Sequence, residues 1–314
     1  MASADVADPL VYYPDSRYIF DFHKTVYNHQ PGKCRLVPGV DYGSEDMETL
    51  ANGLTFITSG VILPSFSEMA KKYYRDHKVR GRIFLFDFNN PDKNAVELKI
   101  TGDLNQTDFV PHGIGSWQDP SSGRLLIYVV NHGSLDDTIE KFEYIDDKKE
   151  LKHLHTYKDP AIYFVNDVAV LEEEKFYFTN FAYFRNRIGG LIEALLQINS
   201  GYIVYFDGTK YTKVSDGYFL ANGLALSLNK QYIYLCTANK DMKIFERKDN
   251  GELILKQVLM LHMDTSGSNA TGITELFLDN GHTLYASSSA SLYKNQLLIG
   301  TVHHKLMYCK VEIL

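Results

Sequence analysis

The residues of this 314-residue sequence that could carry chemistry are amide, imidazole and carboxylate side chains that recur along the chain. The pentapeptide 50–54 (LANGL) is nearly repeated at 220–224, with shorter variants at 111–114 (PHGI) and 165–168 (VNDV). The polar positions are Asn52, His112, Asn166 and Asn222, separated by steps of 60, 54 and 56 residues. Oxygen and imidazole groups gathered around an axis would form a metal site, since hard cations bind carboxylate and amide oxygens.

The elements that must position these side chains are short runs rich in Val, Ile, Tyr and Phe. Such runs occupy residues 82–88, 124–131, 202–206, 231–236 and 297–302, and turn signals stand at 207–208, 249–251 and 279–281. Each recurring polar position is followed by one strand and then two or three more, which describes a four-stranded blade. We therefore expect an all-β fold, a β-propeller whose innermost strands bring the polar residues to a central channel.

One segment departs from the strand pattern. Over residues 191–198, apolar side chains at 191, 192, 195 and 196 share one helical face, and Glu193 and Gln197 share the other. We expect a short covering helix here, and a lipid-facing or lid helix is the alternative.

The composition is that of a globular protein, with 45% hydrophobic residues and a net charge of -7. The dispersed Lys and Arg residues form no basic stripe, which argues against nucleic acid as a partner. No apolar stretch reaches the roughly 18 residues that cross a bilayer, and the first 33 residues contain no apolar core of a secretory signal. The three cysteines, Cys34, Cys236 and Cys309, lack the spacing of a zinc site.

A series of segments, in order from about residue 33 to residue 309, resembles the paraoxonase and arylesterase family. The segments are 43–48 (GSEDME), 50–60 (LANGLTFITSG), 111–114, 129–132 (VVNH), 165–167, 221–223, 298–302 (LIGTV), 304–305 and 308–309. Each match is weak alone, but their order is specific. The resemblance implies a six-bladed propeller with two calcium ions in its channel, which hydrolyses lactones, aryl esters and some organophosphates. It also implies one propeller domain over residues 33–314 after an N-terminal extension, residues 1–32.

The resemblance further implies the ligands of both ions. The catalytic calcium would be held by Glu45, Asn166, Asn222 and Asn269, with Ser268 where the family has Asp; the structural calcium would be held by Asp46, Asp167 and the backbone carbonyl of Ile114. These residue types agree with calcium's preference for six to eight hard oxygen ligands. Neighbouring strand residues point in opposite directions, so an adjacent pair can serve two ions. Without the resemblance, an acidic pair is more typical of a solvated loop, and Asn222-Gly223 of a turn.

Two histidines match a proposed water-activating dyad of the family. His112 would be the general base, His132 would orient it, and calcium would polarise the ester carbonyl. In the competing interpretation, calcium and its carboxylate ligands are the principal catalysts and the histidines shape the pocket. Among the other histidines, His304 aligns with a family position at the mouth of the site.

The sequence departs from the family in three ways. Ser268 leaves Glu45 as the one formal anion of the catalytic site, which predicts weaker calcium binding. Phe181-Ala182 replaces a polar Asp-His pair. Beyond Asn269 the chain passes directly to segments that resemble the last blade, so most of the fifth blade, about 40 residues, is missing. A propeller that loses a blade must retighten or leave unpaired strand edges.

The resemblance also pairs Cys34 with Cys309 in a disulfide that joins the first strand to the last. Cys236 would then be a buried free thiol. Such a disulfide implies an oxidising compartment, extracellular or within the secretory pathway. The sequons at Asn105 and Asn269 permit N-glycosylation there, although Asn269 could not bind a deep calcium ion and carry a glycan at once.

The sequence thus supports calcium-dependent hydrolysis of small esters or lactones as its leading function. The alternative is a catalytically silent, paraoxonase-like propeller with a binding or chaperone-like role, and a third reading is a product too damaged to fold. The complete set His112, His132, Glu45, Asn166 and Asn222 favours the enzyme, whereas Ser268 and the missing blade favour the others. A peripheral association with a lipid or membrane surface is a further expectation.

Overall fold

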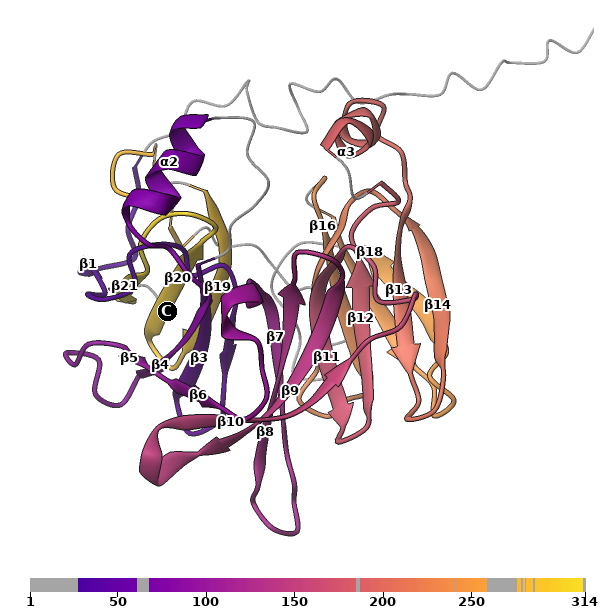
Figure 1. The fold of residues 1–314 in the computed structure, drawn as a ribbon, viewed down its shortest axis with the longest axis horizontal. Coiled ribbons are helices and arrows are strands. Elements are labelled where there is room, and N and C mark those ends of the chain that lie inside the picture. Colours follow the sequence, from indigo (N-terminus) through magenta and orange to yellow (C-terminus); the bar gives the residue numbers. More distant parts are fainter. Residues whose placement is uncertain are drawn as a thin grey trace, which may run out of the picture.

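The computed structural model describes residues 28–60, 68–184, 187–239, 241–258, 276–277, 279, 281–284 and 286–312. These residues are mostly strands, and they form five sheets that surround a central axis like the blades of a propeller (Figure 1). Along the chain, the first two sheets comprise β2 (Met47–Thr49), β3 (Leu54–Ser59), β4 (Arg82–Asp87) and β5 (Val96–Glu97), and β7 (Pro111–Gln118), β8 (Leu125–His132), β9 (Asp137–Ile145) and β10 (Glu150–Tyr157). The all-β propeller expected from the sequence is confirmed.

The remaining sheets repeat the same plan. They comprise β11 (Val165–Glu172), β12 (Lys175–Asn180), β13 (Gly201–Phe206) and β14 (Tyr211–Tyr218); β15 (Ala221–Leu226), β16 (Tyr232–Thr237), β17 (Met242–Arg247) and β18 (Leu253–Val258); and β19 (Ser287–Tyr293), β20 (Gln296–Thr301), β21 (Met307–Lys310) and β1 (Cys34–Leu36). Neighbouring strands within these three sheets are antiparallel. In the second sheet, β6 (Lys99–Thr101) adds a parallel edge strand to β10, and short 3-10 helices lie at Gln106–Asp108 and Asp146–Lys148.

The core lies between the sheets, because the central strands of most sheets, such as β3, β8, β12 and β20, bury both of their faces. Alternate residues of β8 show this: Leu126, Tyr128 and Val130 pack toward the third sheet, and Leu125, Ile127 and Val129 pack toward the first, all of them buried. A strand buried on both faces reads as a continuous apolar run rather than an alternating one. This explains why the strands were visible in the sequence as Val-, Ile-, Tyr- and Phe-rich runs.

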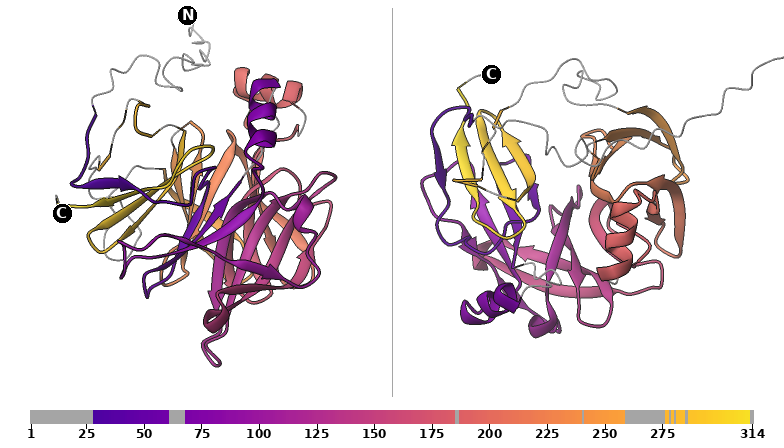
Figure 2. Two further views of the ribbon diagram at one scale, coloured as in Figure 1. Left: turned by 60° about the vertical axis from the view of Figure 1, so that its left-hand side comes forward. Right: turned by 90° about the horizontal axis from the view of Figure 1, so that it is seen from above.

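The innermost strands pack in sequence around the axis, with β19 against β2, β2 and β3 against β7, β7 against β11, and β11 against β15. Within the residues that the structure describes, no strand of β15–β18 packs in the same way against β19–β21. Seen from above, these two sheets flank the one interval of the ring where the described strands do not adjoin (Figure 2, right). Five sheets instead of six agree with the missing blade.

A disulfide joins β1, the first strand of the chain, to β21, the last strand, as predicted. Cys34 and Cys309 are directly opposite in the β1–β21 register, and their Sγ atoms are bonded across a sequence separation of 275. The third cysteine, Cys236, is exposed on β16, so the expectation of a buried thiol was wrong. The strand was predicted correctly, but the face of Cys236 that a neighbouring sheet would cover is open.

Two helices cover one end of the ring (Figure 1). α2 (Glu68–Asp76) follows the end of β3, and α3 (Arg187–Leu195) follows the end of β12. These strand ends pair with the beginnings of β2 and β11, since Met47 lies opposite Ile57 and Val165 opposite Asn180. The helices therefore lie at the end where the innermost strands begin. No helix of the described residues is long and apolar enough to cross a membrane.

The expected helix at 191–198 exists but is shifted and turned. It begins at Arg187 and ends at Leu195; among its described side chains Glu193 is buried, whereas Ile192 and Leu195 are exposed. The Glu193 carboxylate accepts hydrogen bonds from the backbone N–H groups of Tyr183 and Phe184, at 3.0 and 2.8 Å, and from the hydroxyl of Ser200. Unpaired N–H groups beside the helix thus determine which face it buries.

Candidate active site in the central channel

The predicted site residues occupy equivalent positions at the beginnings of innermost strands. His112, Asn166 and Asn222 are each the second residue of their strand, in β7, β11 and β15. Asp46 and Asp167 are also equivalent, because the N–H of each donates to a threonine hydroxyl of the adjoining strand at 3.1 Å. Glu45 is therefore the first-sheet counterpart of Asn166.

The position of Asn52 in the repeat corrects one prediction. Asn52 lies in the turn between β2 and β3, where its Oδ1 accepts a hydrogen bond from the Leu54 N–H at 3.0 Å. The two similar segments therefore occupy different structural positions: 50–54 forms the turn between β2 and β3, and 220–224 lies at the start of β15. In the first sheet, the polar residue that meets the channel is Glu45 instead, two residues before β2.

A continuous line of hydrogen-bonded side chains crosses the channel end of the second sheet. Oε1 of Glu45 lies 2.9 Å from Nε2 of His112, whose Nδ1 lies 2.6 Å from Nε2 of His132. Nδ1 of His132 lies 2.9 Å from Oδ1 of Asp137, the first residue of β9. Glu45, His112 and Asp137 are buried. The structure thus brings the two predicted histidines into direct contact and adds a carboxylate that the sequence analysis missed.

Electrostatics favours a charged imidazole at His112 in this arrangement. Burial disfavours the imidazolium, but the Glu45 carboxylate outweighs it and raises the pKa of His112 above its usual value, with smaller contributions from Asp46 and Asp137. Asn166 also reaches this ring, with its side-chain nitrogen 3.5 Å from His112 Nε2. Glu45 and Asn166 therefore flank the same imidazole nitrogen.

The backbone of the second and third sheets approaches closely beside His112. A Cβ on Gly113 would lie 2.4 Å from the carbonyl oxygen of Asn166 and 2.5 Å from Cα of Asp167. Only glycine permits this approach, which brings the starts of β7 and β11 together. In the fourth sheet, the Asn222 carbonyl accepts a hydrogen bond from the Thr179 hydroxyl at 2.8 Å, so β15 is held against β12.

Asp46 and Asp167 form an acidic centre next to the line of side chains that runs from Glu45 to Asp137. Asp46 Oδ2 accepts the Ile114 N–H at 2.9 Å, and Asp167 Oδ2 accepts the Leu224 N–H at 2.7 Å. Burial and the Glu45 carboxylate raise the pKa of Asp46 to about 6. Burial and the neighbouring Asp46 raise the pKa of Asp167 well above its usual range. Carboxylates buried side by side in this way favour a bound cation or a proton.

The donor chemistry of this centre fits a hard cation. Among the described residues, neither Asp46 nor Asp167 has an ion pair with Lys, Arg or His, so their charge is not balanced by a basic side chain. No group of three or more His, Cys, Asp or Glu side chains in the described part of the chain is arranged to hold a metal by itself. A cation here would need amide and carbonyl oxygens as well, which is the mixed oxygen set that suits calcium. Two of the predicted ligands, Ser268 and Asn269, lie outside the described residues.

Two further residues near the channel were not predicted. The Glu48 carboxylate of β2 accepts a hydrogen bond from the Ser116 hydroxyl at 2.5 Å, and burial raises its pKa to about 7. His303 lies between β20 and β21, with Nδ1 3.2 Å from the hydroxyl of Tyr74 on α2. Burial lowers the pKa of His303, and the Glu45 carboxylate opposes this shift. The expected position of His304 at the mouth of the site stays a prediction.

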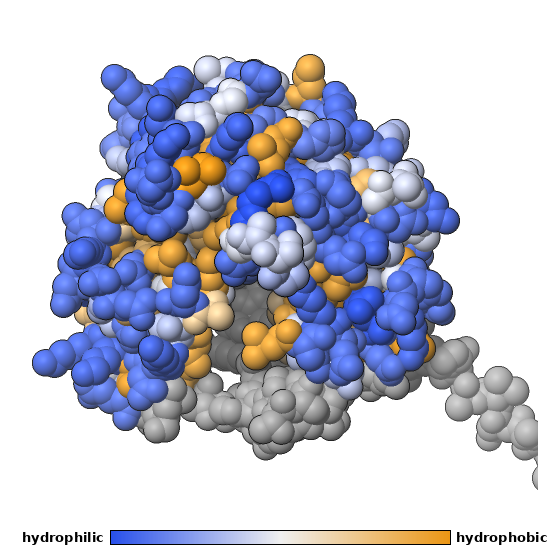
Figure 3. All heavy atoms as spheres, turned by 90° about the horizontal axis from the view of Figure 1, so that it is seen from below, coloured by the Kyte–Doolittle hydropathy of each residue, from blue (hydrophilic) through white to orange (hydrophobic). Residues whose placement is uncertain are grey.

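Apolar side chains replace the polar pair expected in this family at 181–182. Ala182 is buried with Phe219 and Leu220, and Phe164 and Phe181 pack against them with ring centroids 5.4 Å apart. These residues adjoin the starts of β11 and β15, beside Asn166 and Asn222. The end of the channel is therefore walled by hydrophobic groups on this side. Viewed from the opposite end, the outer surface is largely hydrophilic, and hydrophobic residues lie beside the central hollow (Figure 3).

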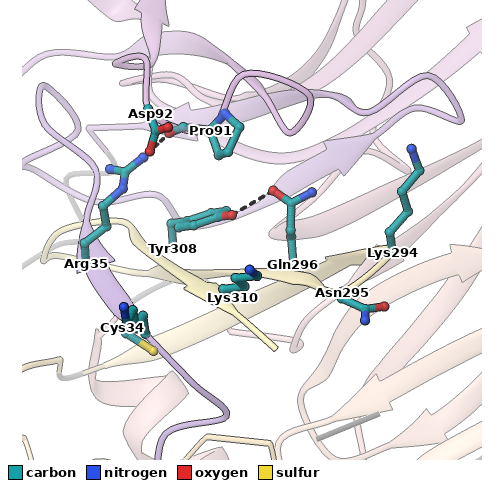
Figure 4. A pocket seen from close by; sticks show the side chains of 10 residues that line it. Cys34, Arg35, Pro91, Asp92, Lys294, Asn295, Gln296, Tyr308 and Lys310 are labelled. Atoms are coloured by element: carbon teal, nitrogen blue, oxygen red, sulfur yellow. Dashed lines mark hydrogen bonds between the residues drawn. The ribbon is translucent and has the colours of Figure 1, made fainter. Parts of the chain in front are cut away.

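A separate cavity of about 560 Å³ lies at the outer edge of the last sheet, lined by Lys33, Cys34, Arg35, Pro91, Asp92, Lys294, Asn295, Gln296, Tyr308 and Lys310 (Figure 4). Its chief contacts are structural. Arg35 donates to the Pro91 carbonyl and lies over the Tyr308 ring at 5.1 Å, and the Tyr308 hydroxyl donates to Gln296 at 2.7 Å. Because Pro91 follows β4, these contacts tie the last sheet to the first. The chemistry-bearing side chains lie in the channel, not in this cavity.

Comparison with known proteins agrees with this geometry. A family model described as arylesterase matches residues 25–272 and 259–311. The chain belongs to the arylesterase family. Curated relatives include serum paraoxonase/lactonase 3 of Oryctolagus cuniculus, 30% identical with 89% of each chain covered, and serum paraoxonase/arylesterase 1 of Homo sapiens, 30% identical with 88% of each covered. The X-ray structure of a putative gluconolactonase shares the fold, with a TM-score of 0.50 and 12% identity over 92% of this chain and 98% of that one.

The same comparisons locate the missing part of this arylesterase-family chain. The alignment with the Oryctolagus cuniculus protein spans 324 positions, more than the 314 residues of the whole chain, although it covers only 89% of it. Gaps in this chain account for the excess. The family model matches in two pieces that meet at 259–272, the region between β18 and β19. This is where the described sheets do not adjoin.

Proposed function

We propose that this chain hydrolyses lactones and aryl esters in the central channel with the help of bound calcium. The observation that carries the proposal is the line of side-chain contacts from the buried Glu45 through the buried His112 to His132, placed beside the Asp46 and Asp167 carboxylates. Such a site combines groups that can move a proton with oxygen atoms that can hold a cation. Membership of the arylesterase family supports the same reaction class.

The chain's own residues would divide the work as follows. Glu45, Asn166 and Asn222 would hold a catalytic calcium together with Ser268 and Asn269, and Asp46, Asp167 and the Ile114 carbonyl would hold a structural one. A bound calcium supplies Lewis acidity toward the ester carbonyl. A cation held by Glu45 would oppose the rise that this carboxylate causes in the pKa of His112 and so favour the neutral ring. Neutral His112 would accept the proton of the attacking water at Nε2, and His132, bonded to Nδ1 at 2.6 Å, would stabilise the resulting charge. Glu45 and Asn166 fix this nitrogen toward the channel.

The walls of the channel end favour substrates with an apolar part. Phe164, Phe181 and Ala182 form a hydrophobic side, and aromatic rings of α2 face His303 on another side, where Tyr74 and His303 are 6.3 Å apart between ring centroids. Apolar walls with a few placed polar groups are typical of small-molecule sites. An aryl ester or an alkyl-substituted lactone would place its leaving or acyl group against these walls.

The decisive experiment is hydrolysis of phenyl acetate and of a γ-lactone by purified chain, with calcium and with a chelator. We expect calcium-dependent turnover that falls about 100-fold or more in His112→Gln, the range that general acid–base catalysis contributes. His155→Gln is the matched control, because His155 is exposed on β10 and contacts Tyr157 instead of the channel. Turnover that persists in chelator, or that survives His112→Gln unchanged, would contradict this assignment.

One observation favours the second candidate, a catalytically silent binding propeller. The described sheets β15–β18 and β19–β21 do not pack against each other, and Ser268 removes a carboxylate from the proposed catalytic site. A folded protein that binds calcium but turns over neither ester would support this alternative. The disulfide Cys34–Cys309 supports an oxidising, extracellular setting in either case, and the exposed Asn105 is accessible to glycosylation there.

Peripheral association with a lipid surface is the remaining part of the proposal. Ile188, Ile192 and Leu195 of α3 are exposed, and Tyr183 beside them is 67% exposed. An apolar helix face of this kind can lie in a membrane interface. The test is sedimentation of the chain with phosphatidylcholine vesicles. Binding that is lost in Leu195→Ser but kept in Leu228→Ser, a control at an exposed leucine outside α3, would support the association. Equal binding by both variants would contradict it.

A further inference from the structure

The side chain that this inference concerns is Asp137. It is the first residue of β9 and lies directly opposite His132 in the β8–β9 register. Only 1% of Asp137 is exposed, and both of its oxygens are engaged: Oδ1 lies 2.9 Å from His132 Nδ1, and Oδ2 accepts the Val165 N–H at 3.1 Å. One oxygen therefore meets the histidine pair, and the other is anchored to the first residue of β11 in the next sheet.

These contacts determine where the imidazole protons lie. A carboxylate can only accept, so the proton between Asp137 and His132 belongs to His132 Nδ1. Neutral His132 then has an unprotonated Nε2, which must accept from His112 Nδ1 across 2.6 Å. His112 Nδ1 therefore donates its hydrogen bond to His132, and His112 Nε2 faces Glu45 and Asn166 in the channel.

The opposite tautomer of His132 would break this order. With its proton on Nε2, His132 would point a lone pair at the Asp137 carboxylate and a hydrogen at His112. His112 would then accept at Nδ1 and keep its one proton on Nε2, where the Glu45 carboxylate, also an acceptor only, would hold it. With Asp137 in place, His132 Nε2 is the acceptor for the His112 Nδ1–H, so Nε2 is the nitrogen of His112 that loses a proton when the ring becomes neutral.

We propose that Asp137 is a positioning residue of the site, fixing His132 as the Nδ1–H tautomer so that His112 presents its Nε2 to the channel. The catalytic part of this statement rests on the proposed function. The tautomer part does not, because it follows from the contacts alone and can be observed without substrate.

A second carboxylate–imidazole pair shows what a structural contact looks like in the same sheet. Glu140 lies 3.0 Å from Nε2 of His153, and its oxygens also accept from the hydroxyls of Thr138 and Thr156. That network lies among β8, β9 and β10, and His153 contacts the Phe142 ring rather than the channel. Asp137 differs because its partner His132 contacts a second histidine, His112, which in turn contacts Glu45.

The test is nitrogen-15 NMR of the full, calcium-loaded chain labelled at histidine, with Asp137→Asn and Asp137→Ala compared with the wild type. We expect His132 of the wild type to show a protonated Nδ1 and an unprotonated Nε2. In Asp137→Ala the Nε2–H tautomer should become populated, and in Asp137→Asn the ratio should shift in the same direction. Asp136→Asn is the matched control, since Asp136 is the preceding residue, is 53% exposed and pairs with Lys158 at 2.7 Å.

Kinetics separates positioning from mere support. We expect kcat to fall about 10- to 100-fold in Asp137→Asn with KM changed less than about threefold, because only the proton transfer is impaired. A wild-type spectrum with His132 as the Nε2–H tautomer would overturn the inference even if every variant fails to fold. A tautomer that is unchanged in both variants would overturn it as well. If the chain hydrolyses no ester, the proposed function fails, but the spectra still decide the role of Asp137.

Discussion

Removal of calcium should make the stability of this chain depend on pH, with the sign set by Asp46. In the metal-free chain its pKa is raised from 3.8 to about 6, chiefly by burial and then by Glu45. A carboxyl whose folded pKa is raised adds stability that is complete below pH 3.8 and is lost as the pH rises through about 6. One pKa unit corresponds to about 1.4 kcal/mol, so this group alone costs the metal-free chain about 3 kcal/mol by pH 8.

The assay is thermal unfolding at pH 5 and pH 8, in chelator and in excess calcium. About half of this loss falls between pH 5 and pH 8, because at pH 5 the group is already deprotonated in the unfolded chain but not in the folded one, so roughly 1.4 kcal/mol is at stake. In a chain of this size that corresponds to a Tm in chelator that is about 2 °C lower at pH 8. Calcium should restore the loss at pH 8, since a ligand at a hundredfold excess over its Kd contributes about 3 kcal/mol. The neutral variant Asp46→Asn should lose most of the pH dependence and most of the calcium response, and Asp103→Asn, an exposed change, should keep both. A wild-type Tm that is equal at both pH values, or indifferent to calcium, would refute the acidic-centre reasoning.

Three other changes have defined outcomes. Replacing Cys34 by Ala should lower the free energy of unfolding by about 2–5 kcal/mol, since the lost crosslink to Cys309 spans 275 positions. Non-reducing peptide mapping of the wild type should show Cys34 linked to Cys309. A link from either residue to Cys236 would contradict the strand order. Glu193→Ala leaves two backbone N–H groups and a hydroxyl without their acceptor, so hydrogen exchange around α3 should accelerate by about 10-fold or more, and unchanged protection would show that other contacts hold the helix. Ser268→Asp should tighten calcium and raise esterase turnover by restoring an anionic ligand, and a folded, calcium-bound variant with no gain would place the defect in the missing blade.

The central strands of the blades were predictable because both of their faces are buried, so their sequences are continuous apolar runs. The expected run 82–88, for example, corresponds to β4, Arg82–Asp87, and 202–206 lies within β13, Gly201–Phe206. The helix at 191–198 was placed less well. Its apolar face suggested burial of the leucines, but the N–H groups of the preceding segment require an acceptor, and Glu193 supplies it. The amphipathic pattern of a helix gives no sign that N–H groups outside the helix need a hydrogen-bond acceptor.

The site was predictable where a motif identifies a strand start and was missed where it depends on pairing. His112 and His132 were found, and they are in contact. Asp137 was not, although it follows His132 by five residues across a hairpin, a spacing that makes the two cross-strand neighbours. His303 was not singled out, because a turn between strands gives no periodicity from which to predict its contact with Tyr74 of α2.

The acidic residues of the channel also hold the ring together, which links the site to the fold. Asp46 bonds the Ile114 N–H, Asp137 bonds the Val165 N–H, and Asp167 bonds the Leu224 N–H. Each carboxylate thus joins its own sheet to the innermost strand of the next, from the first sheet through to the fourth. Charge-assisted hydrogen bonds of this kind are stronger than neutral ones, but they place negative charge where burial opposes it.

That arrangement explains how the described part of the site can form although the described strands leave an interval in the ring. The three bonds connect only the first four sheets, which carry Glu45, both histidines, Asn166 and Asn222, whereas the interval without described packing lies between the fourth sheet and the last. The last sheet is held to the first by separate contacts, Ser288 to the Glu45 carbonyl at 2.7 Å among them. Losing the packing on one side of the fourth sheet therefore removes neighbours of β16 and Cys236 but leaves the line from Glu45 to Asp137 intact. A cation that balances Asp46 and Asp167 would stabilise the site and the junctions between these sheets at once, because both depend on the same carboxylates.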